Sequence, residues 1–475
     1  MSRPSRIVQT NSGPVRGKTF EFADKPPASA FLGIPYAQPP VGELRFKSAE
    51  TAARKAMDRS EGVFEQFTPA CPQIKHRTLQ EVIGDEDCLY LNVFTPENTL
   101  PPSPKLPVLF YIHGGCFLMD TAESIGDEGI CRLSDIVVVS INYRLGIFGF
   151  LSLNNEECAG NFGLWDMTLG PPLGPREHRG RITIAGQSAG AVAVDLLTLS
   201  PHSRDLFAQG ILVSRHHLRA LESRKTLVEW AKYRGCTVER DERERSERRR
   251  SSSSSATSRP TALAVGVLLD ANFTYAPHNF LPLWTATSSR NPSKELRKEA
   301  PRKAFVNGVT EYEGLGMFKG KFNYPDLSSE QFMAKMLRFV RPTIPEQLAA
   351  DLVARSDGRL QAARRNTRAR PTSVLSDFLH NHGAHRFGVE RTKLGDRVYN
   401  FVFTHYKKGT SWGPATHCTE LPFFFGKSIL GDFEVEAEDE PVIERFTTDP
   451  NNEKYAAKWL PVDAEHPGRH FVFAT

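Results

Sequence analysis

The chain has 475 residues and a formal net charge of +5, and 40% of its residues are hydrophobic and 24% charged. This is the composition of a globular protein that can bury a core, and so small a net charge gives no indication of nucleic-acid binding. No run of about 18 apolar residues occurs, so no membrane span is expected.

The start of the chain, MSRPSRIVQTNSGPVRG, lacks the apolar stretch of a secretory signal. As written, the sequence predicts a cytoplasmic protein; a secreted or ER-lumenal protein is expected if the N-terminus is incomplete. The seven cysteines include no C-x-x-C pair, which argues against a zinc ribbon or thioredoxin-like chemistry. Their sparse, odd number is typical of buried, reduced thiols, although one disulfide pair would also fit.

Apolar runs predict the strands of a largely parallel sheet. The proline-rich run Phe31–Phe46 is expected to form a rigid surface loop over the core. Leu89–Phe94 alternates like a strand, and Leu106–His113 and Asp135–Asn142 are almost continuously apolar, as in strands buried on both faces. Further strand-like runs are Arg181–Ala185, Lys303–Val309 and Arg397–Thr404.

Alternating strands and helical segments over this length predict one doubly wound α/β domain covering residues 1–475, with helical insertions. Two segments interrupt the pattern. Gly170–Gly180 contains three prolines and three glycines where a crossover helix is expected. Glu239–Arg250 carries six arginines and five acids and is followed by serines. Its balanced charge predicts a disordered low-complexity insertion at 239–260 rather than a nucleic-acid-binding arm.

The pentapeptide Gly186–Gly190 reads GQSAG and stands between a strand-like run and the helix-forming run Ala191–Leu199. Strand, G-x-S-x-G turn and helix together describe a nucleophile elbow. In that geometry Ser188 stands above the sheet, next to the positive end of the helix. The alternative is an ordinary glycine-rich turn.

Three further pieces follow strand-like runs, where open α/β sheets place their sites. The glycine-rich turn His113–Cys116 can aim backbone N–H groups at one point, as an oxyanion hole requires. Glu313, with Glu311 as its competitor, is a carboxylate that could orient an imidazole. His417 could act as general base. Its neighbour Cys418 allows a metal site or a thiol nucleophile, but nothing else in the sequence converges there.

Eight blocks in this order resemble the type-B carboxylesterase and cholinesterase family of α/β hydrolases. A further block, KWLPVDAEHPGRHF, matches near the C-terminus, whereas roughly 170–180 and 215–290 do not match and are either diverged or wrongly joined exons. The eight blocks are FLGIPYAQPPVGELRF at 31, EDCLYLNVFTP at 86, YIHGGCF at 111, INYRLGIFGFLS at 141, GNFGLWD at 160, ITIAGQSAG at 182, GVTEYEG at 308 and THCTELPFFFG at 416.

The resemblance implies an α/β-hydrolase fold and a triad of Ser188 as nucleophile, His417 as general base and acid, and Glu313 as orienting carboxylate. It favours Glu313 over Glu311 because the acid of the family directly precedes the glycine. It implies no cofactor and no metal, and a small-molecule ester as substrate. It also implies an oxyanion hole made by the N–H groups of Gly115, Cys116 and Ala189, and a disulfide between Cys71 and Cys88.

The sequence departs from the family at three points near the site. Cys116 stands where a third glycine is usual, which is tolerable if its φ stays negative. Gln187 replaces a common glutamate beside the nucleophile. The stretch between Cys71 and Cys88 has no tryptophan to bind choline. The last two departures favour a general esterase over a choline esterase.

The function expected from these residues is that of a serine hydrolase that cleaves carboxylic esters through an acyl-enzyme. The alternative is a catalytically inactive, cholinesterase-like adhesion or scaffold protein, although such relatives usually lack a member of the triad. A lipase would be expected to carry a long apolar lid, and none is visible.

Overall fold

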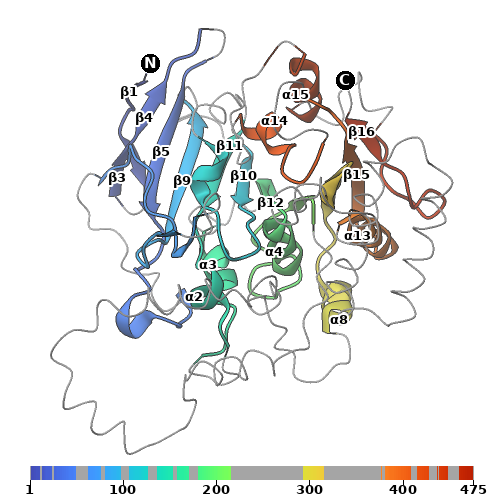
Figure 1. Ribbon diagram of the computed structural model, residues 1–475, viewed down its shortest axis with the longest axis horizontal. Coiled ribbons are helices and arrows are strands. Elements are labelled where there is room, and N and C mark those ends of the chain that lie inside the picture. The colour runs from blue at the N-terminus through green and yellow to red at the C-terminus, as the bar shows by residue number, and fades with distance from the viewer. Residues whose placement is uncertain are drawn as a thin grey trace, which may run out of the picture.

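The computed structural model describes sixteen parts of the chain, drawn in colour in Figure 1. The insertion expected at 239–260 and the segment 171–179 lie outside them. The described residues are 2–10, 13–23, 26–49, 62–75, 81–97, 106–126, 136–152, 158–170, 180–215, 292–314, 376, 380–407, 415–426, 436, 438–447 and 459–473.

A twisted sheet of eleven strands crosses the described part of the molecule, and the chain runs across it from the N-terminal strands to the C-terminal ones (Figure 1). The first strands pair antiparallel, and from β11 onward all pairings are parallel. In spatial order the strands are β1 (Ser2–Pro4), β4 (Lys18–Phe20), β5 (Ala28–Pro35), β9 (Tyr90–Pro96), β11 (Val137–Ile141), β10 (Val108–Ile112), β12 (Ile182–Gln187), β13 (Gln209–Val213), β14 (Ala304–Thr310), β15 (Arg397–Phe403) and β16 (Phe471–Phe473).

Two small sheets accompany the large one. One joins β2 (Val8–Thr10), β3 (Gly13–Arg16) and β6 (Gly62–Val63), and the other joins β7 (Gln73–Ile74) and β8 (Val82–Ile83). The α-helices are α2 (Gly146–Phe150), α3 (Phe162–Leu169), α4 (Ala189–Leu197), α8 (Pro292–Glu299), α13 (His382–Lys393), α14 (Leu421–Phe425) and α15 (Glu440–Thr447), and the 3₁₀ turns are η1 (Gly42–Leu44) and η4 (Ala122–Ile125). Of the helices described, none has the length and hydrophobicity needed to cross a bilayer.

Helices cover both faces of the sheet, as the alternation of β10 shows. Phe110 and Ile112 pack in the core cluster that contains α2, α3 and α4. Tyr111, which points the other way, packs on α14, and its ring centroid is 4.7 Å from that of Phe425. Because successive side chains of a strand point to opposite faces, this central strand is apolar on both.

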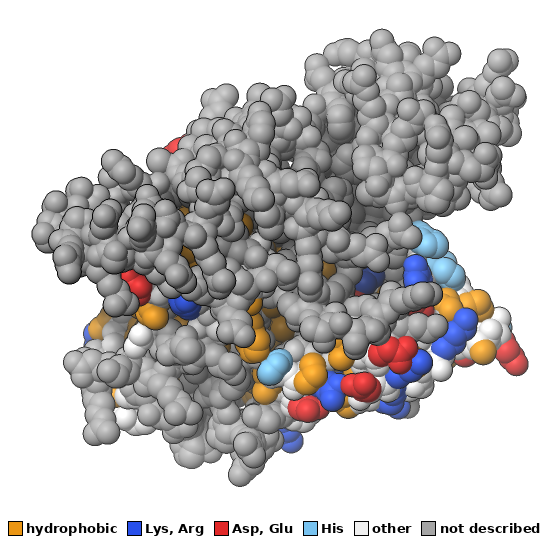
Figure 2. Space-filling model, turned by 90° about the horizontal axis from the view of Figure 1, so that it is seen from below, with side chains coloured by type: hydrophobic (Ala, Val, Ile, Leu, Met, Phe, Trp, Pro, Cys, Tyr) orange, Lys and Arg blue, Asp and Glu red, His pale blue; other side chains and the backbone are white. Residues whose placement is uncertain are grey.

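Charged side chains on the described surface are mixed in sign. Figure 2 shows basic and acidic side chains interspersed where described residues reach the face it displays. This distribution agrees with a formal net charge of only +5 on 475 residues.

Most strand predictions are confirmed within two residues at either end. The exception is the run Phe31–Phe46, which was expected to form a surface loop. Its first part belongs to β5, which pairs with β4 and β9 and is buried over most of its length. The two prolines that follow Gln38 lie beyond this strand, so they cost the ladder no hydrogen bond.

The connection from β11 to β12 contains helices despite the irregular segment Gly170–Gly180. α2 and α3 lie on this path and contribute Ile147 and Met167 to the core. A buried ion pair joins the segment just before α2 to α3. The Arg144 guanidinium donates from Nη2 to Asp166 Oδ1 at 2.7 Å and from Nε to Oδ2 at 2.8 Å, and the Arg144 backbone N–H donates to Oδ2 at 3.0 Å. β12 then begins in parallel register with β10.

We expect Asp166→Ala to lower the free energy of unfolding by about 3–5 kcal/mol, because it leaves a guanidinium buried without its carboxylate. Arg386→Ala, which breaks the exposed pair with Glu390 on α13, should cost less than about 1 kcal/mol. Urea unfolding of both variants measures the difference. Equal losses would show that the buried pair does not hold this connection.

Candidate active site

The segment Gly186–Gly190 forms the sharp turn that the sequence predicts between β12 and α4. Ser188 adopts φ 56° and ψ −119°, a strained backbone conformation, and is buried. Its N–H donates to the carbonyl of Val213 on β13 at 2.9 Å, which ties the turn to the neighbouring strand.

The two glycines of the turn are required by close backbone approaches. A Cβ on Gly190 would lie 2.1 Å from the carbonyl oxygen of Ile112, and a Cβ on Gly186 would lie 2.4 Å from the carbonyl of Gly190. Both distances are shorter than any real contact, so only glycine lets α4 start so close to β10.

We expect Gly190→Ala to lower the free energy of unfolding by about 1–3 kcal/mol or to prevent folding, because backbone atoms must move to admit the methyl group. Gly180→Ala is the matched control, since a Cβ there has no neighbour within 4 Å among the described residues. Thermal unfolding of both variants is the measurement. A Gly190→Ala protein as stable as the control would show that the turn can widen freely.

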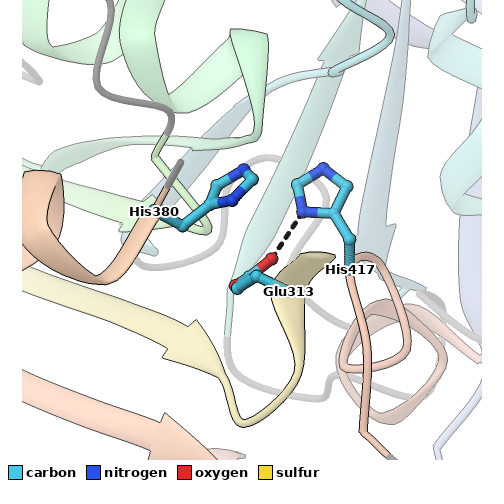
Figure 3. Close-up of side chains that lie close together, drawn as sticks. All are labelled: Glu313, His380 and His417. Carbon is cyan, nitrogen blue, oxygen red and sulfur yellow. Dashed lines mark hydrogen bonds and ion pairs between the residues drawn. The ribbon is translucent and has the colours of Figure 1, made fainter. Parts of the chain in front are cut away.

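The carboxylate of Glu313 and the imidazole of His417 form one hydrogen-bonded pair. His417 Nδ1 lies 2.6 Å from Glu313 Oε2 (Figure 3). The other oxygen, Oε1, accepts from the hydroxyl of Ser214 at 2.6 Å and from the N–H of Thr310 at 2.7 Å. Glu313 is fully buried at the end of β14, whereas Glu311 is exposed. The structure therefore brings Glu313, not Glu311, to the histidine.

The surroundings of Glu313 keep its carboxyl group ionised. Burial acts to raise the pKa of Glu313, but the rings of His380 and His417 and the hydrogen bonds from His417 and Ser214 outweigh it and lower the pKa to about 2. Burial acts to lower the pKa of His417, yet this pKa lies well above its usual value. Because burial keeps Cys418 a neutral thiol, the charge that sustains the rise is the Glu313 carboxylate.

The second ring nitrogen of His417 faces the elbow. Its Nε2 lies 3.3 Å from the side-chain nitrogen of Gln187, which also donates to Cys418 Sγ at 3.2 Å. Among the hydrogen bonds of the described residues, Ser188 Oγ makes none to His417. Catalytic hydrogen bonds are often long in a protein without substrate, so this spacing is compatible with a nucleophile and its base.

The glycine-rich loop after β10 passes directly beside the serine. A Cβ on Gly114 would lie 3.1 Å from Ser188 Cβ. The N–H groups of Gly115, Cys116 and Ala189 have no acceptor among the described residues. Tyr143 fixes the start of this loop, because its hydroxyl donates a hydrogen bond to the His113 carbonyl at 3.0 Å. Backbone donors without an acceptor among the described residues, on the elbow and on the loop beside it, are compatible with the oxyanion hole that the resemblance implies.

The condition under which a side chain at position 116 is tolerable, a negative φ, is not met. Gly115, Cys116 and Phe117 have φ values of 83°, 58° and 59°, because the chain folds into a tight turn in which the N–H of Leu118 donates to the Gly115 carbonyl at 2.9 Å. A side chain costs about 1–2 kcal/mol in this left-handed region. The complete burial of Phe117 offsets the cost there, but the Cys116 side chain is exposed.

Comparison with known proteins decides the family. The sequence model of the carboxylesterase family matches residues 4–170 and 178–468. The chain belongs to this family. It therefore has the α/β-hydrolase fold, which agrees with the large, mostly parallel sheet of Figure 1. The matched range includes 215–290, where block-by-block inspection finds no resemblance, and omits only 171–177 between its two parts.

Several similar proteins carry esterase names, whereas others are named neuroligins. "Esterase cest-33" of Caenorhabditis elegans is 32% identical over 98% of this chain and 89% of its own length. An acetylcholinesterase of Danio rerio is 37% identical over 45% of this chain and 36% of its own length. Neuroligin-2 of Mus musculus is 28% identical over 90% of this chain and 56% of its own length.

The disulfide that the family resemblance implies is present in the structure. Cys71 and Cys88 are joined in a disulfide. Residues that sequence inspection did not single out are Ser214, Glu420 and His380. Ser214 follows β13 and could have been found by the rule that sites lie at strand ends. Nothing in the sequence around His380 marks it, since it enters the site from the segment before α13.

A second carboxyl group lies behind Glu313. Glu420 is fully buried, and its Oε1 lies 3.4 Å from the Ser214 hydroxyl oxygen. The same hydroxyl donates the shorter hydrogen bond, of 2.6 Å, to Glu313 Oε1. Burial, and next the charge of Glu313, raise the pKa of Glu420 to about 8. Glu420 is therefore a neutral acid at neutral pH that can itself donate a hydrogen bond to Ser214.

This shift makes stability depend on pH. Because the folded pKa of Glu420 is about 8 and its ordinary value 4.5, the folded protein binds the extra proton, and stability falls as pH rises between these values. Glu420→Gln should remove the fall and be more stable than wild type above pH 8, by up to roughly 4 kcal/mol. Thermal melts across this range test it, with the exposed Glu295→Gln as control. A variant that keeps the wild-type slope would contradict the assignment.

The left-handed backbone of Cys116 should lower the stability of the protein. Cys116→Gly should raise the free energy of unfolding by about 1 kcal/mol, because it removes the strain of a side chain at φ 58° and loses little packing. Cys116→Ala keeps the strain and should give no such gain. Urea unfolding distinguishes the two, and equal stabilities of the glycine and alanine variants would refute the strain.

Proposed function

We propose that this carboxylesterase-family protein is a serine hydrolase that cleaves small-molecule carboxylic esters through an acyl-enzyme. The observation that carries the proposal is the His417 ring, bonded through Nδ1 to the buried Glu313 with its Nε2 on the side of the elbow. A base held in one orientation beside a strained serine is the arrangement of an activated nucleophile.

In the proposed reaction Ser188 Oγ attacks the ester carbonyl and its proton passes to His417 Nε2. The oxyanion is stabilised by the N–H groups of Gly115, Cys116 and Ala189. The C–O bond to the alcohol then breaks, and the departing oxygen takes the proton from His417. Water, deprotonated by the same nitrogen, hydrolyses the acyl-enzyme and restores the serine. Glu313 holds the Nδ1–H tautomer and balances the charge of the imidazolium.

Gln187 bears on the substrate class. Where many family members have a carboxylate, this chain places an amide that contacts His417 and Cys418. The site thus lacks one negative charge beside the nucleophile, which favours uncharged esters over cationic ones such as choline esters. An inactive adhesion or scaffold role is the competing proposal, since the match to Neuroligin-2 covers 90% of the chain at 28% identity.

Ser188→Ala separates the two proposals. The wild-type protein should hydrolyse a short-chain nitrophenyl ester and take up one phosphoryl group from an organophosphate on Ser188, while the variant should do neither. We expect the loss in kcat to be about 10⁴-fold or more, because the nucleophile is gone. Circular dichroism checks that the variant is folded. A folded wild-type protein with no turnover and no label would support the scaffold role.

The pH profile tests the role of Glu313. Protonated His417 cannot accept the serine proton, so kcat/KM should fall as pH falls through a midpoint above 6.5, because the pKa of His417 is raised. Glu313→Gln removes the charge that sustains the raised pKa, so the midpoint should move to lower pH and kcat should drop by roughly 10⁴-fold. A profile with an unchanged midpoint would show that Glu313 does not act on His417.

A further inference from the structure

A second histidine lies against the proposed catalytic base. His380 is buried, and its ring centroid is 4.8 Å from that of His417. Figure 3 shows the two rings on either side of the Glu313 carboxylate, with His380 entering from the chain just before α13, Glu313 from the end of β14, and His417 from the loop before α14. Three segments far apart in sequence thus bring two imidazoles and one carboxylate together.

The three side chains have the spacing of a metal site. One ligand atom from each of Glu313, His380 and His417 can be chosen so that all lie within 4.8 Å of one another. Two imidazoles and a carboxylate are a donor set that zinc accepts in catalytic sites, with water in the fourth position. The same set suits copper and nickel but not magnesium or calcium, which require oxygen ligands.

We propose that Zn²⁺, or another divalent transition-metal ion of the same donor preference, binds between Glu313, His380 and His417 and thereby inhibits the enzyme. The ion would take the place of the Nδ1 proton between Glu313 and His417, and that proton moves to Nε2, so that His417 binds as a neutral imidazole. The binding itself rests only on the position of these side chains, whereas the inhibition rests on the proposed esterase function.

The geometry allows the ion with a small adjustment. A tetrahedral zinc ion with bonds of about 2.1 Å holds its ligand atoms roughly 3.4 Å apart. Glu313 Oε2 and His417 Nδ1, which lie 2.6 Å apart in their hydrogen bond, must therefore separate to admit the ion, while the chosen ligand atoms, all within 4.8 Å of one another, close around it. The His417 side chain retains 17% of its exposure, which leaves room for it to turn and for water to enter as the fourth ligand. The side chains of Glu313 and His380 are buried, so they have less freedom to move than His417.

The charge balance also favours a cation. The carboxyl group of Glu313 is fully buried, and a cation placed between it and the two imidazoles would balance its negative charge. With the metal on Nδ1, the neutral ring of His417 carries its proton on Nε2, the nitrogen that faces the elbow, and cannot accept the proton of Ser188. Ester hydrolysis should therefore stop, and a chelator should restore it.

The test uses the whole protein and two readouts. Zn²⁺ in the micromolar range should inhibit nitrophenyl ester hydrolysis, EDTA should reverse the inhibition, and Mg²⁺ should have no effect. Co²⁺ serves as a spectroscopic probe, because its visible absorption bands report a site with two imidazoles whether or not the protein is active. His380→Phe keeps a ring against His417 and removes the nitrogen ligand. It should raise the inhibitory Zn²⁺ concentration, relative to the rate of the variant itself, by at least about tenfold and abolish the cobalt bands.

His385→Phe is the matched control. His385 lies exposed on α13, the helix that follows His380, so its replacement should leave both readouts as in wild type. Cobalt bands in a protein without esterase activity would uphold the metal site and reject the proposed function. A wild-type protein that shows neither zinc inhibition nor cobalt bands would overturn the site. Inhibition that survives in His380→Phe but is lost in Cys116→Ser would also overturn it, by assigning the ion to the thiol.

Discussion

Because β10, β12, β13, β14 and β15 pair in parallel, their carboxyl ends share one edge of the sheet, and every side chain of the candidate site is placed from that edge. The glycine-rich loop follows β10, the elbow follows β12, Ser214 follows β13 and Glu313 lies just past β14. Parallel pairing in register therefore brings together groups that are up to about 200 residues apart in the chain. The close approach of Gly190 to the carbonyl of Ile112 is the tightest condition this arrangement imposes, since it fixes where α4 begins.

Backbone strain concentrates where this edge meets the reactive groups. Ser188, Cys116 and Phe117 all have φ between 56° and 59° without being glycine. Such conformations persist only when the surroundings hold them, and here the buried Phe117 ring, which contacts Phe150 with centroids 5.0 Å apart, anchors the loop.

The interior behind the serine is unusual in its polar content. Glu313, Glu420, Ser214 and His380 are all buried; hydrogen bonds from Ser214 join the two carboxyl groups, and the His380 ring lies tilted against that of His417. Two carboxyl groups this close cannot both ionise cheaply, so their pKa values separate, one to about 2 and the other to about 8. Burial lowers the pKa of His380 although Glu313 acts to raise it, whereas the pKa of His417, which is hydrogen-bonded to the same carboxylate, is raised. The group therefore controls the charge of His417 as well as its orientation.

The sequence by itself determined the sheet, the elbow and the family, because these depend on local pattern: β-branched runs, glycines at a sharp turn and ordered motif blocks. It could also point to Glu313 and His417, since both lie in blocks that resemble the family. The tertiary structure decided what depends on contacts across the chain. The strand within Phe31–Phe46 forms because two neighbouring strands pair with it, and Cys116 is left-handed because its turn closes on Gly115. His380 joins the site only because α13 packs against β14 and β15, a contact that no local pattern encodes.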